Sequence, residues 1–174
     1  METKLIAVSS DVYKENLIQA ASLLKNGELV AFPTETVYGL GANGLNTSAV
    51  TKIYQAKGRP SDNPLILHIA DLEQLDNLVE IISPQAKILI NKYWPGPLTI
   101  VFKRKKNVPD IVTGGLDTVA VRMPDNEIAR NLIRMAEMPL AAPSANTSGR
   151  PSPTSAQAVL EKKKKKIAAI VDGG

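Results

Sequence analysis

The sequence predicts a single α/β domain that spans residues 1–174 and is built on a mixed β-sheet with flanking helices. Three observations favour this fold class. The chain has 174 residues, of which 44% are apolar, and this is enough to form one hydrophobic core. Short apolar runs typical of strands alternate with stretches whose apolar residues repeat at helical spacing. We find neither an internal repeat nor a linker.

Seven apolar runs, bounded by glycine, proline or polar residues, predict the strands. They comprise the run around Ile6 and Val8, Glu28–Phe32, Leu65–Ile69, Leu98–Phe102, Thr118–Arg122, Leu140–Ala142 and Ile167–Val171.

Helical spacing and capping signals predict six helices between these strands. They are a helix capped by Asp11 and ended by Asn26-Gly27, a helix over Thr47–Ala56, one from Asp71 with Gln74 in a capping box, one from Ser83-Pro84 to the Pro95-Gly96-Pro97 segment, one over Asp125–Ala136, and one opened by Thr154 with Gln157.

The composition excludes several classes of protein. The chain has no cysteine, so it has no disulfide framework, thiolate metal site or cysteine nucleophile. It also lacks the charged head and apolar stretch of a signal peptide, and it has no run of roughly 18 apolar residues that would span a membrane. We therefore expect a cytoplasmic protein without membrane contact, and no protein-held metal.

The net charge of +4 comes from two lysine-rich runs. Lys103–Lys106 and Lys162–Lys166 contain nine of the 21 basic residues, and the remainder of the chain is net acidic. Such runs are usually solvated ends of strands or helices, although they can also contact nucleic acid. Aromatic residues make up only 4% of the chain, which leaves few platforms for stacking bases.

The segment Pro33–Gly41 is too polar for a core and predicts a binding loop or a simple glycine-rich connection. Glycines let a backbone approach a ligand closely, and the hydroxyl groups can bind a small polar substrate. Gly39, Gly41 and Gly44 match G-x-G-x-x-G, with Asp62 placed like a ribose-binding acid. The match is weak because a dinucleotide site needs the glycines directly after the strand.

Three further groups of residues are candidates for binding. Lys57 and Arg59, beside prolines, can bind an anion or form an exposed cationic helix end. The loop Pro143–Pro153 can surround phosphates with hydroxyl, amide and guanidinium donors, or it can be a flexible loop rich in serine and proline. Thr118 and Arg122 share one face of a strand, and a buried arginine there needs an anion.

Five motifs in this order resemble those of the YrdC-type threonylcarbamoyl-AMP synthases. They are PTETVYGLG, KGRPSDNPLILHI, WPGPLT, TVAVRMP and APSANTSGRPSPT. The resemblance spans about Leu5 to Gly174 and implies a twisted sheet around a basic concave cavity that binds ATP, L-threonine and bicarbonate.

The resemblance also implies roles for individual residues, carried over by motif position. The residues implied to surround L-threonine are Thr36, His68, Thr118, Arg122 and Ala142. The residues implied to hold ATP are Arg59, Asn63, Ser144 and Ser152, with Lys57, Asn146 and Ser148 as adjacent candidates. The candidates for a catalytic role are Lys57, Arg59 and Arg122. His68 by itself can face a pocket, although a place within the sheet is the more common role for such a residue.

The implied reaction joins threonine, bicarbonate and the AMP part of ATP into threonylcarbamoyl-adenylate for tRNA modification. It needs no enzyme nucleophile, and Mg²⁺ would be carried mainly on the phosphates. A downstream threonylcarbamoyl transferase would receive the product. The family's chains continue beyond Asp172-Gly173-Gly174 with a segment that adds a serine and an arginine to the pocket, so we expect that the C-terminal part of the domain is missing here.

Two other classes of function remain open from the residues. The lysine-rich runs allow a module that binds tRNA or double-stranded RNA without catalysis of its own. The glycine pattern allows a dinucleotide oxidoreductase, which would have to bind NAD.

Overall fold

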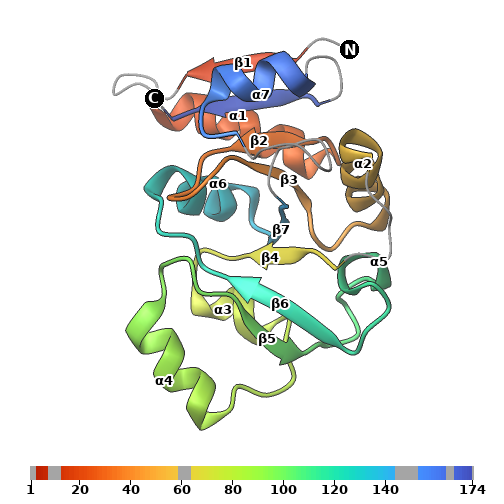
Figure 1. The fold of residues 1–174 in the computed structure, drawn as a ribbon, viewed down its shortest axis with the longest axis vertical. Coiled ribbons are helices and arrows are strands. Elements are labelled where there is room, and N and C mark those ends of the chain that lie inside the picture. The colour runs from red at the N-terminus through yellow and green to blue at the C-terminus, as the bar shows by residue number, and fades with distance from the viewer. Residues whose placement is uncertain (1–2, 8–12, 59–63, 144–152, 164–166, 174) are drawn as a thin grey trace.

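The fold is known from a computed structural model of the chain. The structure describes residues 3–7, 13–58, 64–143, 153–163 and 167–173. These residues form an α/β fold with one mixed sheet of eight strands in the order β1-β8-β2-β3-β7-β4-β6-β5 (Figure 1). The predicted fold class is therefore confirmed.

The strands are short, from two to five residues each. They are β1 (Lys4–Ala7), β2 (Val30–Phe32), β3 (Gly39–Asn43), β4 (Ile66–His68), β5 (Ile100–Lys103), β6 (Thr118–Arg122), β7 (Leu140–Ala141) and β8 (Ala169–Asp172). The helices are α1 (Tyr13–Lys25), α2 (Thr47–Lys57), α3 (Leu72–Asp76), α4 (Pro84–Tyr93), α5 (Asp110–Thr113), α6 (Glu127–Ala136) and α7 (Ala156–Lys163).

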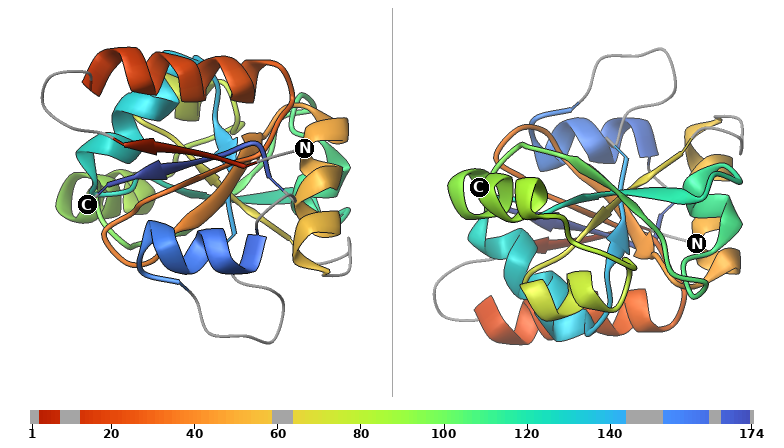
Figure 2. Two further views of the ribbon diagram at one scale, coloured as in Figure 1. Left: turned by 90° about the horizontal axis from the view of Figure 1, so that it is seen from above. Right: turned by 90° about the horizontal axis from the view of Figure 1, so that it is seen from below.

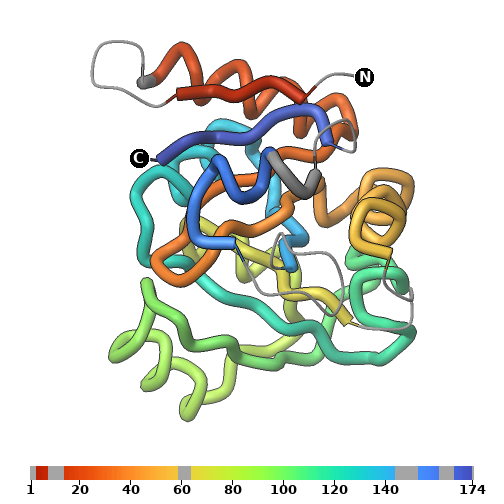
Figure 3. Tube along the Cα trace, turned by 45° about the horizontal axis from the view of Figure 1, so that its top comes forward, coloured from red at the N-terminus to blue at the C-terminus, as the bar shows by residue number. Residues whose placement is uncertain are grey.

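The sheet contains both parallel and antiparallel pairs. β8 runs parallel to both β1 and β2, and β4 runs parallel to β6, whereas β3 and β7 join the two halves through antiparallel pairs. The first and last described strands thus lie side by side at the top of the molecule (Figure 3). Both ends of the described chain are held in the same sheet.

Helices cover both faces of the upper part of the sheet. Viewed from above, α1 lies on one side of the strands and α7 on the other (Figure 2, left). α1 packs against α6, and their apolar residues bury the side chains of Val30, Phe32 and Leu140. On the opposite face, residues of α2, α3, α5 and α7 bury the side chains of Leu40, Leu67 and Val121. Because successive side chains of a strand point to opposite faces of the sheet, the strands contribute residues to two separate cores.

Capping side chains fix the starts of four helices. Asn46, Asp71, Ser83 and Asn126 each accept a hydrogen bond from the backbone N–H three residues later. Such a bond satisfies a donor that a helix start otherwise leaves without a partner. The predicted cap at Asp71 and the predicted start at Ser83-Pro84 are confirmed, and Gln74 accepts a bond from Ala70 N–H.

Four details of the sequence prediction are wrong. Gly39–Gly41 is part of β3 and not of a binding loop, and α5 was not predicted. α6 begins at Glu127 after its cap Asn126, not at Asp125, because the Asn126 carboxamide provides the capping oxygen. Near the start of α7, the side chain that accepts a helix N–H is Ser155, from Ala158, where Thr154 had been expected.

No helix within the described ranges combines the length and the apolar character needed to cross a membrane.

Candidate functional site

The candidate site lies on one face of strands β4, β6 and β5. His68 of β4 is the register partner of Arg122 of β6, Ile66 pairs with Ala120, and Thr118 pairs with Lys103 of β5. Residues two apart on a strand point to the same face. His68, Arg122 and Thr118 therefore share a face, as the strand pattern of Thr118 and Arg122 predicts.

This face is less completely covered by the described residues than the opposite one. Leu67, Val119 and Val121, which point the other way, are at most 2% exposed. On the Arg122 face, Ile66, Thr118 and Ala120 are only half-buried. Val101, the register partner of Ala120, is 62% exposed. The Arg122 face thus has partly exposed strand residues on the same side as a buried cation.

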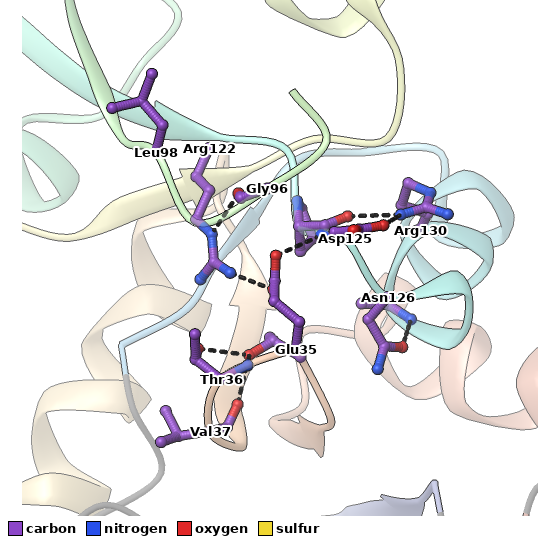
Figure 4. A network of polar contacts seen from close by, with 12 residues as sticks. Glu35, Thr36, Val37, Gly96, Leu98, Arg122, Asp125, Asn126 and Arg130 are labelled. Atoms are coloured by element: carbon purple, nitrogen blue, oxygen red, sulfur yellow. Dashed lines mark hydrogen bonds and ion pairs between the residues drawn. The ribbon is translucent and has the colours of Figure 1, made fainter. Parts of the chain in front are cut away.

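Arg122 is a buried cation held by two other segments of the chain (Figure 4). Its side chain is 10% exposed and pairs with the carboxylate of Glu35. Its Nε donates a hydrogen bond of 3.0 Å to the carbonyl of Gly96. Within the part of the chain that the structure describes, Nη1 makes no hydrogen bond, so this edge of the guanidinium can bind a further anion.

Glu35 accepts two hydrogen bonds through different oxygens. Its Oε1 contacts Nη2 of Arg122, and its Oε2 accepts a 2.7 Å bond from the backbone N–H of Asp125. Its side chain is 21% exposed, although its backbone lies in an open loop. Burial alone would raise the pKa of Glu35, but the Asp125 N–H and the charge of Arg122 outweigh it and lower the pKa. Glu35 is therefore ionised at neutral pH.

The loop from Pro33 to Tyr38 is ordered by a threonine hydroxyl. Oγ1 of Thr34 donates to the carbonyl of Val37 at 2.6 Å and accepts from the backbone N–H of Thr36 at 3.2 Å. The hydroxyls of Thr34 and Thr36 lie 3.0 Å apart. Small hydroxyl side chains commonly organise turns in this way. The result is that Glu35 and Thr36 are presented next to Arg122 (Figure 4).

The segment after α4 contacts Arg122 through the carbonyl of Gly96. Gly96 N–H donates to the carbonyl of Met123, so Gly96 binds β6 and the turn after it through both backbone groups. A Cβ atom at Gly96 would lie 2.3 Å from the carbonyl oxygen of Tyr93. Only glycine fits there. Trp94 then donates its indole N–H to the carbonyl of Leu98 at 2.8 Å.

His68 is buried beside Arg122 and is neutral. Burial and the positive charge of Arg122 lower its pKa to about 4, against the opposing effects of Glu35 and two backbone carbonyls. Nδ1 lies 3.2 Å from the carbonyl of Ile66, which favours the tautomer with the proton on Nδ1. Phe32 packs edge-on against the ring, with centroids 6.3 Å apart. His68 thus sits in the sheet and also lines the Arg122 side of it.

Two more residues of the expected threonine site share this face. Ala142 donates its N–H to the carbonyl of Ile66 and is 5% exposed. Thr118 lies at the opposite end of β6 from Arg122, roughly 13 Å away for four residues of extended strand. Thr36, His68 and Arg122 are thus placed around the carboxyl ends of β4 and β6. Ala142 lies on the same face beside the start of β4, and Thr118 lies farther along this face.

Lys57 does not belong to this cluster. It is the last residue of α2, is 4% exposed and has interactions of its own. Figure 1 shows α2 on the right, whereas the turn between β2 and β3 and the end of β6 lie on the left. The other expected phosphate-binding residues fall outside the described ranges. These are Arg59, Asn63, Ser144, Asn146, Ser148 and Ser152. The predicted basic cavity therefore stays a prediction.

Sequence reasoning gave no role to two of the groups that hold Arg122. Glu35 was noted only within the polar loop and its motif PTETVYGLG, and the Gly96 segment only as the end of a helix and the motif WPGPLT. A usable signal existed for Glu35: a buried arginine needs an anion, and an acid lies in the polar loop. Tyr38, at the end of the same loop, is buried. Its hydroxyl accepts a hydrogen bond from the backbone N–H of Gly173, not from Arg122.

Comparison with known proteins identifies the family. The family model named for Sua5, YciO and YrdC and described as telomere recombination matches residues 22–174. The chain belongs to the Sua5/YciO/YrdC family. Relatives in this family include the threonylcarbamoyl-AMP synthase of Pyrococcus abyssi, 55% identical over 172 residues, which cover 99% of this chain and 51% of the relative.

Two further matches within the Sua5/YciO/YrdC family agree. The threonylcarbamoyl-AMP synthase of Bacillus subtilis is 57% identical over 159 residues, which cover 91% of this chain and 46% of the relative. The crystal structure of P. abyssi Sua5 complexed with L-threonine superposes with a TM-score of 0.96 at 55% identity, covering 99% of this chain and 51% of that one. The chain therefore spans about half the length of these relatives.

Proposed function

We propose that this chain carries the threonylcarbamoyl-AMP synthase activity of its relatives, with L-threonine bound beside Arg122. The observation that carries the proposal is the buried guanidinium of Arg122, which faces a half-covered strand surface and keeps Nη1 for a further anion. The carboxylate of an amino acid fits this donor. The likeness to a relative complexed with L-threonine supports the same assignment.

The proposed chemistry needs no nucleophile from the protein. The neutral amine of threonine attacks the carbon of bicarbonate, and water leaves to give threonylcarbamate. A carbamate oxygen then attacks the α-phosphorus of ATP, and pyrophosphate leaves with the electron pair of the broken P–O bond. The contribution of the protein is to hold the reactants together and to neutralise their charges.

Most of the residues that we expect to bind ATP lie outside the described ranges. We place the phosphates near Lys57 and the expected ligands in residues 59–63 and 144–152, with Mg²⁺ carried on the phosphates. Lys57, Arg59 and Arg122 are the proposed groups that balance the negative charge of the reactants. Among the described residues, no three His, Asp or Glu side chains gather as metal ligands.

The proposed partners are a downstream threonylcarbamoyl transferase, which would use the adenylate, and weakly bound tRNA. The ion pairs of the Lys103–Lys106 run argue against RNA binding as the main function. Lys103 pairs with Glu80, Arg104 pairs with Asp110, and Lys105 donates to the carbonyl of Asp76. The two ion pairs neutralise part of the positive charge of the run. RNA binding as the main function would predict affinity that falls steeply with added salt.

A reactant-omission experiment tests the proposed function. Purified chain is supplied with ATP, Mg²⁺, L-threonine and bicarbonate, and both pyrophosphate and threonylcarbamoyl-adenylate are measured. We expect both products only when all the reactants are present. In parallel, ATP binding should tighten in the presence of threonine and bicarbonate. Absence of this synergy together with absence of both products would contradict the proposal.

A further inference from the structure

Glu35 joins two parts of the candidate site that are far apart in the sequence. It lies in the loop after β2, yet it binds Arg122 at the end of β6 and the backbone N–H of Asp125 in the following turn. Arg130 of α6 holds the same turn from the other side, through the carbonyl of Pro124 at 2.9 Å and the Asp125 carboxylate at 3.3 Å. The turn is thus fixed from both sides.

The contacts of Glu35 also fix the orientation of the arginine. A guanidinium is planar, so two contacts in its plane define its direction. Nε donates a hydrogen bond to the Gly96 carbonyl, and Nη2 donates one to Glu35. Within the described residues, Nη1 is the guanidinium nitrogen that has no hydrogen-bond partner. An arginine side chain that is already held loses less conformational freedom when it binds a ligand.

The loop that carries Glu35 also carries Thr36. Because Thr34 ties the loop to itself, movement of Glu35 would displace the neighbouring hydroxyl as well. Figure 4 shows Glu35 and Arg122 pointing toward one another, with Thr36 on the loop beside them.

We propose that Glu35 is a positioning residue for the amino-acid substrate, which holds Arg122 and Thr36 in the geometry that binds it. This rests on the proposed function, since the substrate is threonine. Glu35 acts through Arg122 and does not itself bind the substrate carboxylate, because two carboxylates would repel each other.

A double-mutant cycle tests this proposal. Threonine affinity is measured by calorimetry or NMR titration for the unsubstituted chain, Glu35→Gln, Arg122→Gln and the double variant. Glu35→Gln keeps the shape of the side chain but turns a charge-assisted hydrogen bond into a neutral one. We expect it to weaken threonine binding about tenfold and to leave ATP affinity unchanged. When Arg122→Gln is already present, adding Glu35→Gln should weaken threonine binding by less than about twofold, because the effects of coupled residues are not additive.

The control is Glu80→Gln, which breaks the exposed ion pair with Lys103 at 3.8 Å and should leave threonine affinity unchanged. Thermal unfolding and backbone NMR spectra of each variant establish that it is folded. If Glu35→Gln unfolds the chain, Glu35→Asp is used in its place, because it keeps the charge on a shorter side chain. We expect Glu35→Asp to weaken threonine binding, but by less than the tenfold effect expected for Glu35→Gln.

Two outcomes would overturn the inference alone: threonine binds the unsubstituted chain and either Glu35 variant equally well, or Glu35→Gln has the same effect with and without Arg122. Failure of the unsubstituted chain to bind threonine would overturn the proposed function, and this inference with it.

Discussion

Arg122 is the residue on which the candidate threonine site depends. It is buried, yet its charge is balanced by Glu35 and its Nε is satisfied by a carbonyl. A buried charge without such partners would be strongly destabilising. Burial and the charge of Arg122 together lower the pKa of the neighbouring His68 and keep this ring neutral. The charge of Arg122 thus affects the pKa values of both Glu35 and His68.

The position of Arg122 can be tested through Gly96. In Gly96→Ala, the new Cβ would approach the carbonyl oxygen of Tyr93 to 2.3 Å, so the segment must move. We expect the free energy of unfolding to fall by about 1–3 kcal/mol. Threonine affinity should fall too, because Gly96 also accepts the bond from Nε. Chemical denaturation and calorimetry measure the two effects.

Gly39→Ala is the matched control for this substitution. Its Cβ would meet the ring of Phe32 and the side chain of Ala142 at 3.4–3.6 Å, which is ordinary contact. Equal losses of stability in the two variants would contradict the account of Gly96.

At the scale of elements, the sequence predicts most of the fold, and the misses have physical causes. Strands such as Thr118–Arg122 and the face shared by Thr118 and Arg122 follow from the alternation of apolar residues. β3 was missed because Gly39 and Gly41 remove side chains where the Phe32 ring packs across the strand, so its apolar pattern is interrupted. α5 has only four residues and is too short for helical periodicity.

The cap of α6 connects an element to the site. Asn126 accepts the bond from Ala129 N–H immediately after the turn that Glu35 and Arg130 hold. Asn126→Ala should lower the free energy of unfolding by about 1 kcal/mol. Asn126→Asp should keep most of the stability, since a carboxylate also caps a helix start and favours its dipole. Denaturant titrations of both variants check this, and an equal loss in both would contradict the capping role.

At the scale of the whole molecule, the sheet brings together segments that are distant in sequence. Glu35, Gly96, Arg122 and Asp125 meet because β2, β6 and the segment after α4 end in one region (Figures 1 and 4). The individual motifs could be found in the sequence, and the resemblance gave them roles. The sequence indicates that Arg122 needs an anion, but it does not identify Glu35 as that anion, because local patterns do not tell which loop reaches which strand end.

Global stability should depend on pH through His68. Its pKa is about 4 in the folded state, whereas the ordinary value of 6.5 applies to the unfolded chain. The unfolded state therefore binds a proton below pH 6.5, and the folded state does not until about pH 4. Stability should fall as pH decreases through this window, approaching about 1.4 kcal/mol per pH unit below pH 6.

Denaturation curves between pH 7 and 5, above the range where most carboxylates titrate, measure this slope. Because His68 is the only histidine, His68→Gln should flatten it. A slope that is the same in both proteins would show that His68 titrates normally in the folded state.

The most direct test of the central claim is a threonine titration followed by NMR through the ring of His68. The single ring gives one set of signals, and it lies beside Arg122 on the proposed site. The account predicts a saturable shift of these signals with L-threonine, which weakens at least tenfold in Arg122→Gln and is unchanged in the exposed control Arg134→Gln. Signals that do not respond to threonine, or that respond equally in Arg122→Gln, would contradict a threonine site at Arg122.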